Sequence, residues 1–505
     1  MSPTFTAIDL SVVVVYLLGT TALGIWVGRR QKDAKDYFVA DRAIPWWAVM
    51  FSVVATETSA LTFISIPGLA FARDLGFLQI AAGYIIGRAV ISVTLLPRYY
   101  QGELVTAYAL LERRFGLTTR RFTSIVFMVT RAMADSVRVF ATAIPVALIL
   151  GSTVRQDYVM PAAILILGLL TMIYTYRGGM KAVVWTEILQ ASIYITGGVA
   201  AVILLGRLVP GGWSAILRTG AAAGKFHVID ATLTVSQDHN LWAGLIGGAF
   251  LSMASHGADQ LIVQRLLSSR SLGDARKALV GSGIAVFCQF TLFLLIGVGL
   301  YAFYQGREFV RSDEVFPTFI LEEMPQGLVG LIVAAIVAAT MSTHSGAINS
   351  LAAATTHDIY LPLTGRKADD PRTLRTGKLF ALVWGVGLTL GALLFKQQGT
   401  PVVVVALGIA SFTYGALLGG FFLAMFWPWA RQRDAILGMA VGIFVMAFVV
   451  FAKQLSAAYP ALSETLGPFA RIAWPWYVLI GTSITFAVGI ASSLLGRANE
   501  KKMDS

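Results

Sequence analysis

Thirteen apolar segments, each 19 to 29 residues long, follow one another along almost the whole chain. A helix needs about 20 apolar residues to cross the hydrocarbon core of a bilayer. Only 13% of the 505 residues are charged, about half the share in a soluble domain. We therefore predict an all-α integral membrane protein that forms a single transmembrane domain over residues 1–505. The predicted spans are 7–28, 46–72, 76–97, 122–150, 158–176, 182–208, 239–262, 277–305, 327–354, 377–395, 400–428, 435–455 and 473–496.

Lysine and arginine residues gather in alternate loops. Of the 39, 26 lie in the 29–45 loop, in every second loop after it and in the last residues, whereas the opposite loops hold 10. Basic residues favour the cytoplasmic side of a membrane, so we predict an outer N-terminus, an inner C-terminus and a multi-pass protein of the cell inner membrane. Because these residues are spread over loops, the net charge of +12 does not indicate nucleic-acid binding.

Two of the segments contain a run of polar residues that favours a break in the helix. Segment 46–72 would be about 40 Å long as one helix, longer than the bilayer core of about 30 Å. Its centre, Ala-Thr-Glu-Thr-Ser-Ala at 55–60, places Glu57 there and favours local unwinding; Pro67-Gly68 predicts a second break. Segment 239–262 is similar, with a polar stretch from Ser252 to Gln260.

Four spans separate the two interrupted segments. Spans two to six (46–208) and seven to eleven (239–428) therefore predict two five-helix inverted repeats, with 7–28 and 435–496 as peripheral helices. Transporters of this kind hold substrate and ion near the membrane midplane, at the broken helices. The alternative is that each polar cluster only packs helices together.

The segment 327–354 contains no charged residue but carries the sequence Ala-Thr-Met-Ser-Thr-His-Ser at 339–345. Ala339, Ser342 and Thr343 are spaced i, i+3, i+4 and share one helix face. Neutral oxygens on one face at membrane depth suit a small monovalent cation. The alternative is that both hydroxyls bond back to carbonyls of their own helix.

Three motifs indicate a family. They are Arg-Gly-Gly-Met-Lys-Ala-Val-Val-Trp-Thr-Glu-Ile-Leu-Gln at 177–190, the 339–345 sequence, and Asp-Gln-Leu-Ile-Val-Gln-Arg at 259–265. With them the chain resembles the sodium/solute symporter family, which has a leucine-transporter-like inverted-repeat fold, from about residue 7 to 496. The resemblance implies a sodium-coupled importer that works by alternating access, with Na⁺ as the coupling ion. It also implies the sodium ligands, which are the backbone carbonyls of Ala55, Thr58 and Ala339 and the hydroxyls of Ser342 and Thr343.

Some members of that family bind a second sodium ion, through hydroxyls one turn further along and a carboxylate on the fifth core helix. Here Ser345 matches, but the next residue is Gly346, and the carboxylate belongs to Glu187 where many relatives have aspartate. Ser345 and Glu187 are thus candidates for a second sodium ion or for a proton. The alternative role of Glu187 is to help sodium leave inward.

The candidate solute ligands do not match those of sugar-transporting relatives, which argues against a hexose. Arg131, Asp135 and Arg138 share one face of the 122–150 segment, and a guanidinium matches a carboxylate bidentately. Acid-transporting relatives place an arginine on this helix, so we expect Arg138 or Arg131 to bind a small organic anion such as a monocarboxylate. The alternatives are a structural Arg-Asp-Arg network and a Glu57 paired to an arginine. The other candidate solute ligands are Glu57, Thr62, Gln79, Ser252, Ser255 and His256, with Arg88 near them.

The predicted function is therefore a secondary active, sodium-coupled importer whose partners are a small-molecule solute, sodium and the lipid bilayer. One alternative is proton coupling through Glu57 or Glu187, or sodium-coupled import of a neutral solute such as a sugar, an amino acid or a vitamin-like compound. A remote alternative is a membrane solute sensor. An enzyme is not expected, and His256 and His344 are expected to be packed polar residues, so Na⁺ is the only metal predicted.

Overall fold

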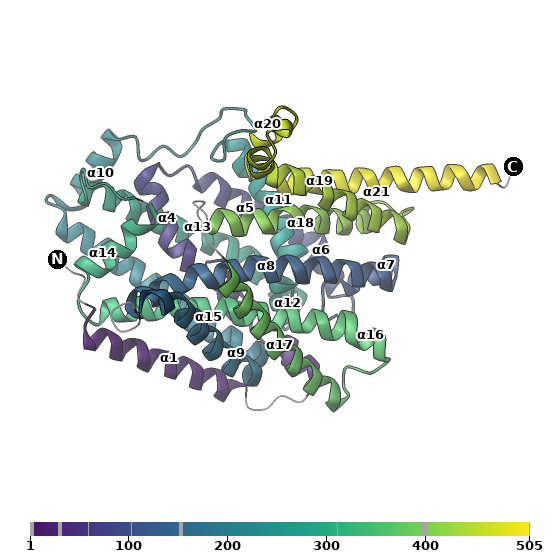
Figure 1. Cartoon of the computed structure of the whole chain (residues 1–505), viewed down its shortest axis with the longest axis horizontal. Helices are drawn as coiled ribbons and strands as arrows, with labels where there is room; N and C mark the ends of the chain where they lie inside the picture. Colours follow the sequence, from purple (N-terminus) through teal and green to yellow (C-terminus); the bar gives the residue numbers. More distant parts are fainter. Residues whose placement is uncertain are drawn as a thin grey trace.

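The computed structural model describes residues 5–28, 33–58, 60–102, 104–150, 155–310, 312–395 and 402–503. Within these ranges the chain is helical without any β-strand, and a single isolated bridge pairs Ile44 with Ser269. Most of the long helices run along the long axis of the molecule, and the two termini lie at opposite ends (Figure 1). The predicted all-α class is confirmed.

The helices of the first half are α1 (Ala7–Val27), α2 (Ala34–Val39), η1 (Ala40–Arg42), α3 (Trp46–Glu57), α4 (Ala60–Ala72), α5 (Leu78–Val93), α6 (Leu95–Tyr99), α7 (Ala109–Phe115), α8 (Leu117–Leu150), α9 (Gln156–Leu208) and α10 (Gly212–Ala222). Those of the second half are η2 (Ala243–Gly247), α11 (Gly248–Gly257), α12 (Gln260–Leu267), α13 (Leu272–Phe303), η3 (Ser312–Glu314), α14 (Val315–Glu323), α15 (Leu328–Ala354), η4 (Thr355–Tyr360), α16 (Leu361–Thr364), α17 (Pro371–Leu394), α18 (Val402–Phe426), α19 (Gln432–Ala458), η5 (Pro460–Leu462), α20 (Ser463–Ala470) and α21 (Trp476–Met503).

The predicted spans coincide with helices, but not every one of these helices is long and apolar enough by itself to cross a membrane. In the described part of the chain, seven are long and apolar enough by themselves, and an eighth is added if the bent pair α3–α4 is counted as one span. Segments 158–176 and 182–208, predicted as two spans, run together as α9. The number of thirteen spans and the orientation of the chain therefore stay predictions.

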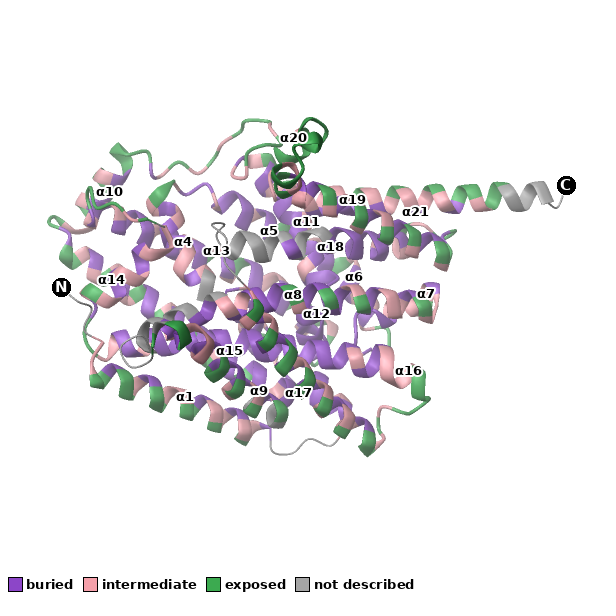
Figure 2. Ribbon diagram, viewed as in Figure 1, coloured by how far each residue is buried: buried purple, intermediate pink, exposed green. Residues whose placement is uncertain are grey.

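The helix with the hydroxyl-rich face lies at the centre of the bundle. In the stretch that begins with α15, 89% of the most apolar window is buried, against 17% for α1. Figure 2 shows the contrast, with α15 mostly buried and α1 largely exposed along its length. The exposed side of α1 carries Val15 and Leu18, and such an apolar surface suits contact with lipid rather than water. The polar segment is thus shielded from the hydrocarbon by the other helices.

The first predicted break in a helix is confirmed, whereas the prediction of a second break nearby, at Pro67-Gly68, is wrong. Helix α3 ends at Glu57 and the following helix is bent by 60° from it, where residues 55–60 predicted unwinding. Pro67-Gly68, however, does not break α4, which continues to Ala72 with Pro67 inside. The close approach of α13 holds this stretch, because a Cβ on Gly297 would lie 2.2 Å from the Pro67 carbonyl oxygen. Neighbouring helices allow proline inside membrane helices in this way.

The second interruption lies at the end of the predicted polar stretch. Helix α11 ends at Gly257, and α12 starts at Gln260. Between them Asp259 has extended backbone angles, and its carboxylate accepts a hydrogen bond of 2.8 Å from the Leu261 amide. Asp259 is therefore the N-cap of α12, so the chain restarts its helix on an acidic side chain.

The stretch between the predicted spans 158–176 and 182–208 belongs to α9, with one residue of unusual backbone conformation. Gly179 lies inside α9 with φ 57° and ψ −159°, a region of backbone conformation that essentially only glycine adopts. A Cβ there would also lie 2.7 Å from the Tyr37 carbonyl oxygen. Glycine therefore lets the chain kink between two helical stretches while α2 packs against it.

We expect Gly179→Ala to destabilise the protein by about 1–3 kcal/mol, the usual cost of a strained backbone conformation, and to lower its yield. The check is the thermal unfolding temperature of the purified protein in detergent. Gly387→Ala on α17 is the matched control, since within the described part of the chain a Cβ there meets nothing within 4 Å. Equal unfolding temperatures for the two variants would contradict the strain argument.

Candidate functional site

A buried carboxylate joins four helices at the centre of the molecule. Glu187 on α9 is fully buried and accepts hydrogen bonds from the hydroxyls of Ser52 and Thr56 on α3, the latter at 3.2 Å. The hydroxyl of Ser342 on α15 donates to its Oε1 at 3.0 Å. Arg265 on α12, also fully buried, donates to the same Oε1 at 2.5 Å. Glu187 therefore brings the hydroxyl-rich face of α15 next to the broken helix α3.

The α15 side of the predicted sodium site offers oxygen atoms that are not used by the helix. Thr343 Oγ1 is buried, and it has no hydrogen-bond partner among the described residues. Ser342 gives its hydroxyl hydrogen to Glu187, which leaves lone pairs of its oxygen for a cation. By contrast, the hydroxyl of Thr340 donates to the Ile336 carbonyl at 2.9 Å. The alternative in which a hydroxyl bonds back to a carbonyl of its own helix therefore applies to Thr340 but not to Ser342 and Thr343.

The α3 side offers backbone carbonyls. Ala55 lies in the last turn of α3, and Thr58 is the residue that ends the helix, with φ −84° and ψ 77°. The last carbonyls of a helix have no partner within it, so this turn can present oxygen atoms to an ion. Thr58 is held by its hydroxyl, which donates to Gln289 Oε1 of α13 at 2.9 Å. Ala339, the remaining predicted ligand, is buried on α15.

The two residues predicted to bind a second ion, Ser345 and Glu187, already have hydrogen-bond partners within the protein. The hydroxyl of Ser345 donates to the Ser342 carbonyl of its own helix at 2.9 Å. Glu187 is occupied by Arg265 and three hydroxyls. Gly346 has no side chain to offer. A second sodium ion or a proton at Ser345 and Glu187 stays a prediction, and the structure pairs this carboxylate with a cation of the chain itself.

The first break carries a second buried ion pair. Glu57 at the end of α3 pairs with Arg88 of α5, which is fully buried and also donates to the Ser282 hydroxyl at 2.7 Å. His256 Nε2 lies 3.7 Å from Glu57 Oε2. Within the described ranges neither His256 Nε2 nor the buried Ser252 hydroxyl oxygen has a hydrogen-bond partner. Glu57 thus matches the alternative of a carboxylate paired to arginine. On α11, Ser252 and His256 each keep one polar atom without a partner in the described part of the chain.

For three other residues predicted to bind the solute, the structure gives less evidence of that role. The Ser255 hydroxyl lies 2.8 Å from His256 Nδ1 and so fixes the imidazole. Thr62 lies in the first turns of α4. Gln79 uses both ends of its amide on the loop before α11, since it donates to the His239 carbonyl at 3.1 Å and accepts from the Asp230 amide at 3.3 Å. Its observed contacts therefore anchor that loop.

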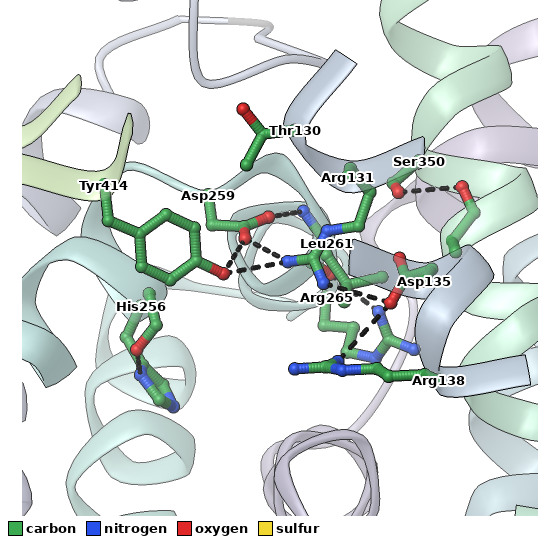
Figure 3. Close-up of polar contacts among 12 residues, drawn as sticks. Thr130, Arg131, Asp135, Arg138, His256, Asp259, Leu261, Arg265, Ser350 and Tyr414 are labelled. Carbon is green, nitrogen blue, oxygen red and sulfur yellow. Dashed lines mark hydrogen bonds and ion pairs between the residues drawn. The ribbon is translucent and has the colours of Figure 1, made fainter. Parts of the chain in front are cut away.

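The predicted arginine face of α8 is part of a larger network (Figure 3). Arg131 pairs with Asp259 at the second break, and its guanidinium also lies 3.4 Å from Asp135. Tyr414 of α18 donates to Asp259 Oδ2 at 2.5 Å. Arg138 meets only Asp135 among the carboxylates of the described residues, at 3.4 Å, and its side chain is 22% exposed against 5% for Arg131. Arg131 is therefore committed to the network, whereas Arg138 keeps accessible donors.

Sequence reasoning missed several members of these sites. Asp259 and Arg265 stand at the two ends of the 259–265 motif, yet they were expected only as family markers. Ser52 and Thr56 are spaced i, i+4 and so share the face of α3 that meets Glu187; that spacing is a signal that could have found them. Within the described ranges no group of histidine, cysteine, aspartate and glutamate could hold a metal ion.

Comparison with known proteins agrees with this geometry. The family model described as "Sodium:solute symporter family" matches residues 37–442. The sodium/sialic acid symporter NanT of Aliivibrio fischeri is 28% identical over 92% of this chain and 91% of its own length. The human sodium/iodide cotransporter is 28% identical over 92% of this chain and 72% of its own length. The human sodium-coupled monocarboxylate transporter 1 is 26% identical over 92% of this chain and 76% of its own length.

A solved structure shows the same fold. It is titled as the substrate-bound outward-open state of a Na⁺-coupled sialic acid symporter, and it matches with a TM-score of 0.84 and 27% identity over 97% of this chain and 98% of its own. All these relatives are sodium-coupled transporters and none is an enzyme. The predicted class, a sodium-coupled solute symporter rather than an enzyme, and the predicted coupling ion are confirmed.

We expect Thr343→Ala to weaken sodium binding about tenfold, because the loss of one ligand oxygen worth about 1.4 kcal/mol has that effect. The measurement is the sodium concentration that half-maximally raises the unfolding temperature of the purified protein. Thr340→Ala is the matched control, since that hydroxyl is bonded within its helix. If both variants respond to sodium as the unaltered protein does, Thr343 is not a ligand.

Proposed function

The chain belongs to the sodium:solute symporter family, and from this membership we propose that it imports a small organic anion across the cell inner membrane, driven by the sodium gradient. One observation carries the sodium part of the proposal. The buried Thr343 Oγ1 lacks a hydrogen-bond partner in the described part of the chain, and Glu187 ties the neighbouring Ser342 to the broken helix α3. A buried acceptor without a donor is costly, and a cation relieves that cost.

The proposed sodium ligands are neutral oxygens from both helices. They are the carbonyls of Ala55, Thr58 and Ala339 and the hydroxyls of Ser342 and Thr343. Five neutral oxygens replace much of the hydration shell of the ion, but they bind it weakly enough for release on the side where sodium is scarce. Because the ligands come from α3 and α15, sodium stabilises the state in which these helices lie together.

The solute is proposed to bind through Arg138. The related proteins carry sialic acid, iodide and monocarboxylates by name, and all three are anions. Arg138 keeps donors free for a carboxylate, which a guanidinium fork binds bidentately. Arg131 links its helix to Asp259, which follows the end of α11 at the second break. There Ser252 and His256 offer neutral polar atoms, suited to an uncharged part of the solute.

Transport is proposed to follow from the two repeats, 46–208 and 239–428, with 7–28 and 435–496 at the periphery. Each proposed repeat opens with a broken helix, at Thr58 and at 258–259. Sodium binds first from outside and joins α3 to α15, which completes the solute site; the bundle then rocks and releases both inward. Coupling requires only that sodium binds the solute-ready state more tightly than the alternative state.

Proton coupling is the second candidate, but the ion pairs favour sodium. It would need a carboxylate that can gain and lose a proton during transport. Glu57 and Glu187 are the two membrane-depth candidates, and each is paired with a fully buried arginine. A proton carried on either residue would leave a buried arginine without its counter-charge, and an unpaired buried charge is costly, which disfavours both as proton carriers.

The test is uptake into proteoliposomes that contain the purified protein. Labelled monocarboxylates, sialic acid, iodide, sugars, amino acids and vitamins are offered with an inward sodium gradient, and separately with a pH gradient in potassium. We expect an anionic solute to accumulate only with sodium. Accumulation that follows the pH gradient and ignores sodium would contradict the proposal.

For the solute found, we expect Arg138→Ala to raise the KM for uptake about tenfold to a hundredfold, because hydrogen bonds to a charged group contribute about 1.5–3 kcal/mol. The sodium concentration for half-maximal uptake at saturating solute should stay the same. Arg138→Lys should recover part of the affinity. Arg155→Ala is the control, as that side chain is 79% exposed at the surface. An unchanged KM in Arg138→Ala would exclude Arg138 as the anion ligand.

A further inference from the structure

The only charged residue of α1, Asp9, is buried, although most of that helix faces outward. The buried residues of α1 form one stripe along the helix, and Asp9 stands in its first turn, followed by Val13, Thr20 and Gly24. We infer that α1 anchors the sodium-binding helix α15, and that Asp9 is a positioning residue for the sodium site. This inference rests on the proposed sodium-driven import and adds to it a residue that does not touch the ion.

Helix α15 begins without a cap of its own. The residue before it, Gly327, has no side chain and a φ of 83°. The amides of Leu328 and Val329 donate to the Pro325 carbonyl at 3.1 and 3.2 Å. The first amides of a helix have no partner within it, and a buried amide such as that of Gly330 is costly without an acceptor. The amides of Gly327 and Gly330 therefore need an acceptor from another part of the chain.

The Asp9 carboxylate is that acceptor. Its Oδ1 accepts a hydrogen bond of 2.8 Å from the Gly327 amide and one of 2.9 Å from the Gly330 amide. Its Oδ2 accepts from the amide and the hydroxyl of Thr6 at 3.0 and 2.6 Å, which caps the start of α1 itself. One carboxylate thus caps two helices, and its charge lies at the positive end of the α15 dipole. The starts of α1 and α15 are thereby held at one level.

The contact between the two helices leaves no room for a side chain on α15. A Cβ built on Gly330 would lie 2.6 Å from both the Cα and the carbonyl oxygen of Asp9. Both atoms belong to the backbone, so a larger residue at 330 would push the helices apart. Helix α1 runs beside α15 and also packs against α9 (Figure 1). The anchor therefore joins α15 to a unit that includes the helix carrying Glu187.

The anchor sets where the proposed sodium ligands lie along the axis of α15. This helix is continuous over Leu328–Ala354, and Thr343 lies about 20 Å beyond Gly330 at a rise of about 1.5 Å per residue. The atoms of a binding site have to be held within about 0.5 Å of their productive positions. An α15 released at its first turn can slide or tilt, which moves the hydroxyls of Ser342 and Thr343 relative to the end of α3. Loss of the anchor therefore weakens sodium binding.

The test is the sodium concentration that half-maximally raises the unfolding temperature of the purified full-length protein. We expect Asp9→Ala to raise that concentration about fivefold, which corresponds to about 1 kcal/mol, the typical contribution of a helix cap. Asp9→Asn keeps an oxygen for the two amides of α15 and should recover most of the affinity. Ser11→Ala is the matched control on the same helix, since this exposed hydroxyl donates to the Ala7 carbonyl, and it should leave sodium binding unchanged.

A variant on the other side of the contact separates positioning from stability alone. Gly330→Ala should also raise the half-saturating sodium concentration about fivefold, and in combination with Asp9→Ala it should add little, because both changes break one contact. A contact that only stabilises the fold would lower the unfolding temperature equally with and without sodium. An unchanged half-saturating concentration in both folded variants would therefore overturn the inference.

Two further outcomes are distinguishable. If Asp9→Ala does not fold, Thr6→Ala decides, because it removes one hydrogen bond that orients the Asp9 carboxylate. It should raise the half-saturating sodium concentration about twofold, and an unchanged value would overturn the inference. An unaltered protein whose unfolding temperature ignores sodium would instead overturn the proposed sodium site itself.

Discussion

The buried ion pair between Glu187 and Arg265 is the interaction on which the centre of this molecule depends. Removal of one partner from a buried pair typically costs about 3–5 kcal/mol, because the other charge stays behind without compensation. Here the loss would weaken the packing of four helices, since hydroxyls of α3 and α15 also donate to Glu187. The same pair aligns Ser342 with the end of α3, where the sodium site is proposed.

Both broken helices follow one electrostatic pattern. Glu57 stands at the first break and pairs with Arg88 of α5, while Asp259 stands at the second and pairs with Arg131 of α8. Unpaired charges and free backbone groups at membrane depth are costly, so each break is stabilised by an arginine from a neighbouring helix. The atoms that remain available around the breaks are mostly neutral oxygens and nitrogens, which suits reversible binding of an ion and a solute.

Much of the fold could be predicted from the sequence because the bilayer imposes length and composition on every span. The first break was predictable from the polar residues around Glu57, but the break expected at Pro67 was wrong, since the packing of α13 against α4 outweighs the local preference of proline. The pairs Glu187–Arg265 and Arg131–Asp259 join residues 78 and 128 positions apart. No local pattern predicts such contacts. The family motifs contain Glu187, Asp259 and Arg265. Arg131 stood out by its helical spacing, but neither signal shows which residues pair.

Equilibrium binding of radioactive sodium to the purified protein tests the central claim, a sodium site between α3 and α15, most directly. The account predicts saturable sodium binding that excess potassium does not displace, and loss of binding at this site in the double variant Ser342→Ala and Thr343→Ala with the fold preserved. Equal displacement by potassium, or unchanged binding in the double variant, would contradict it.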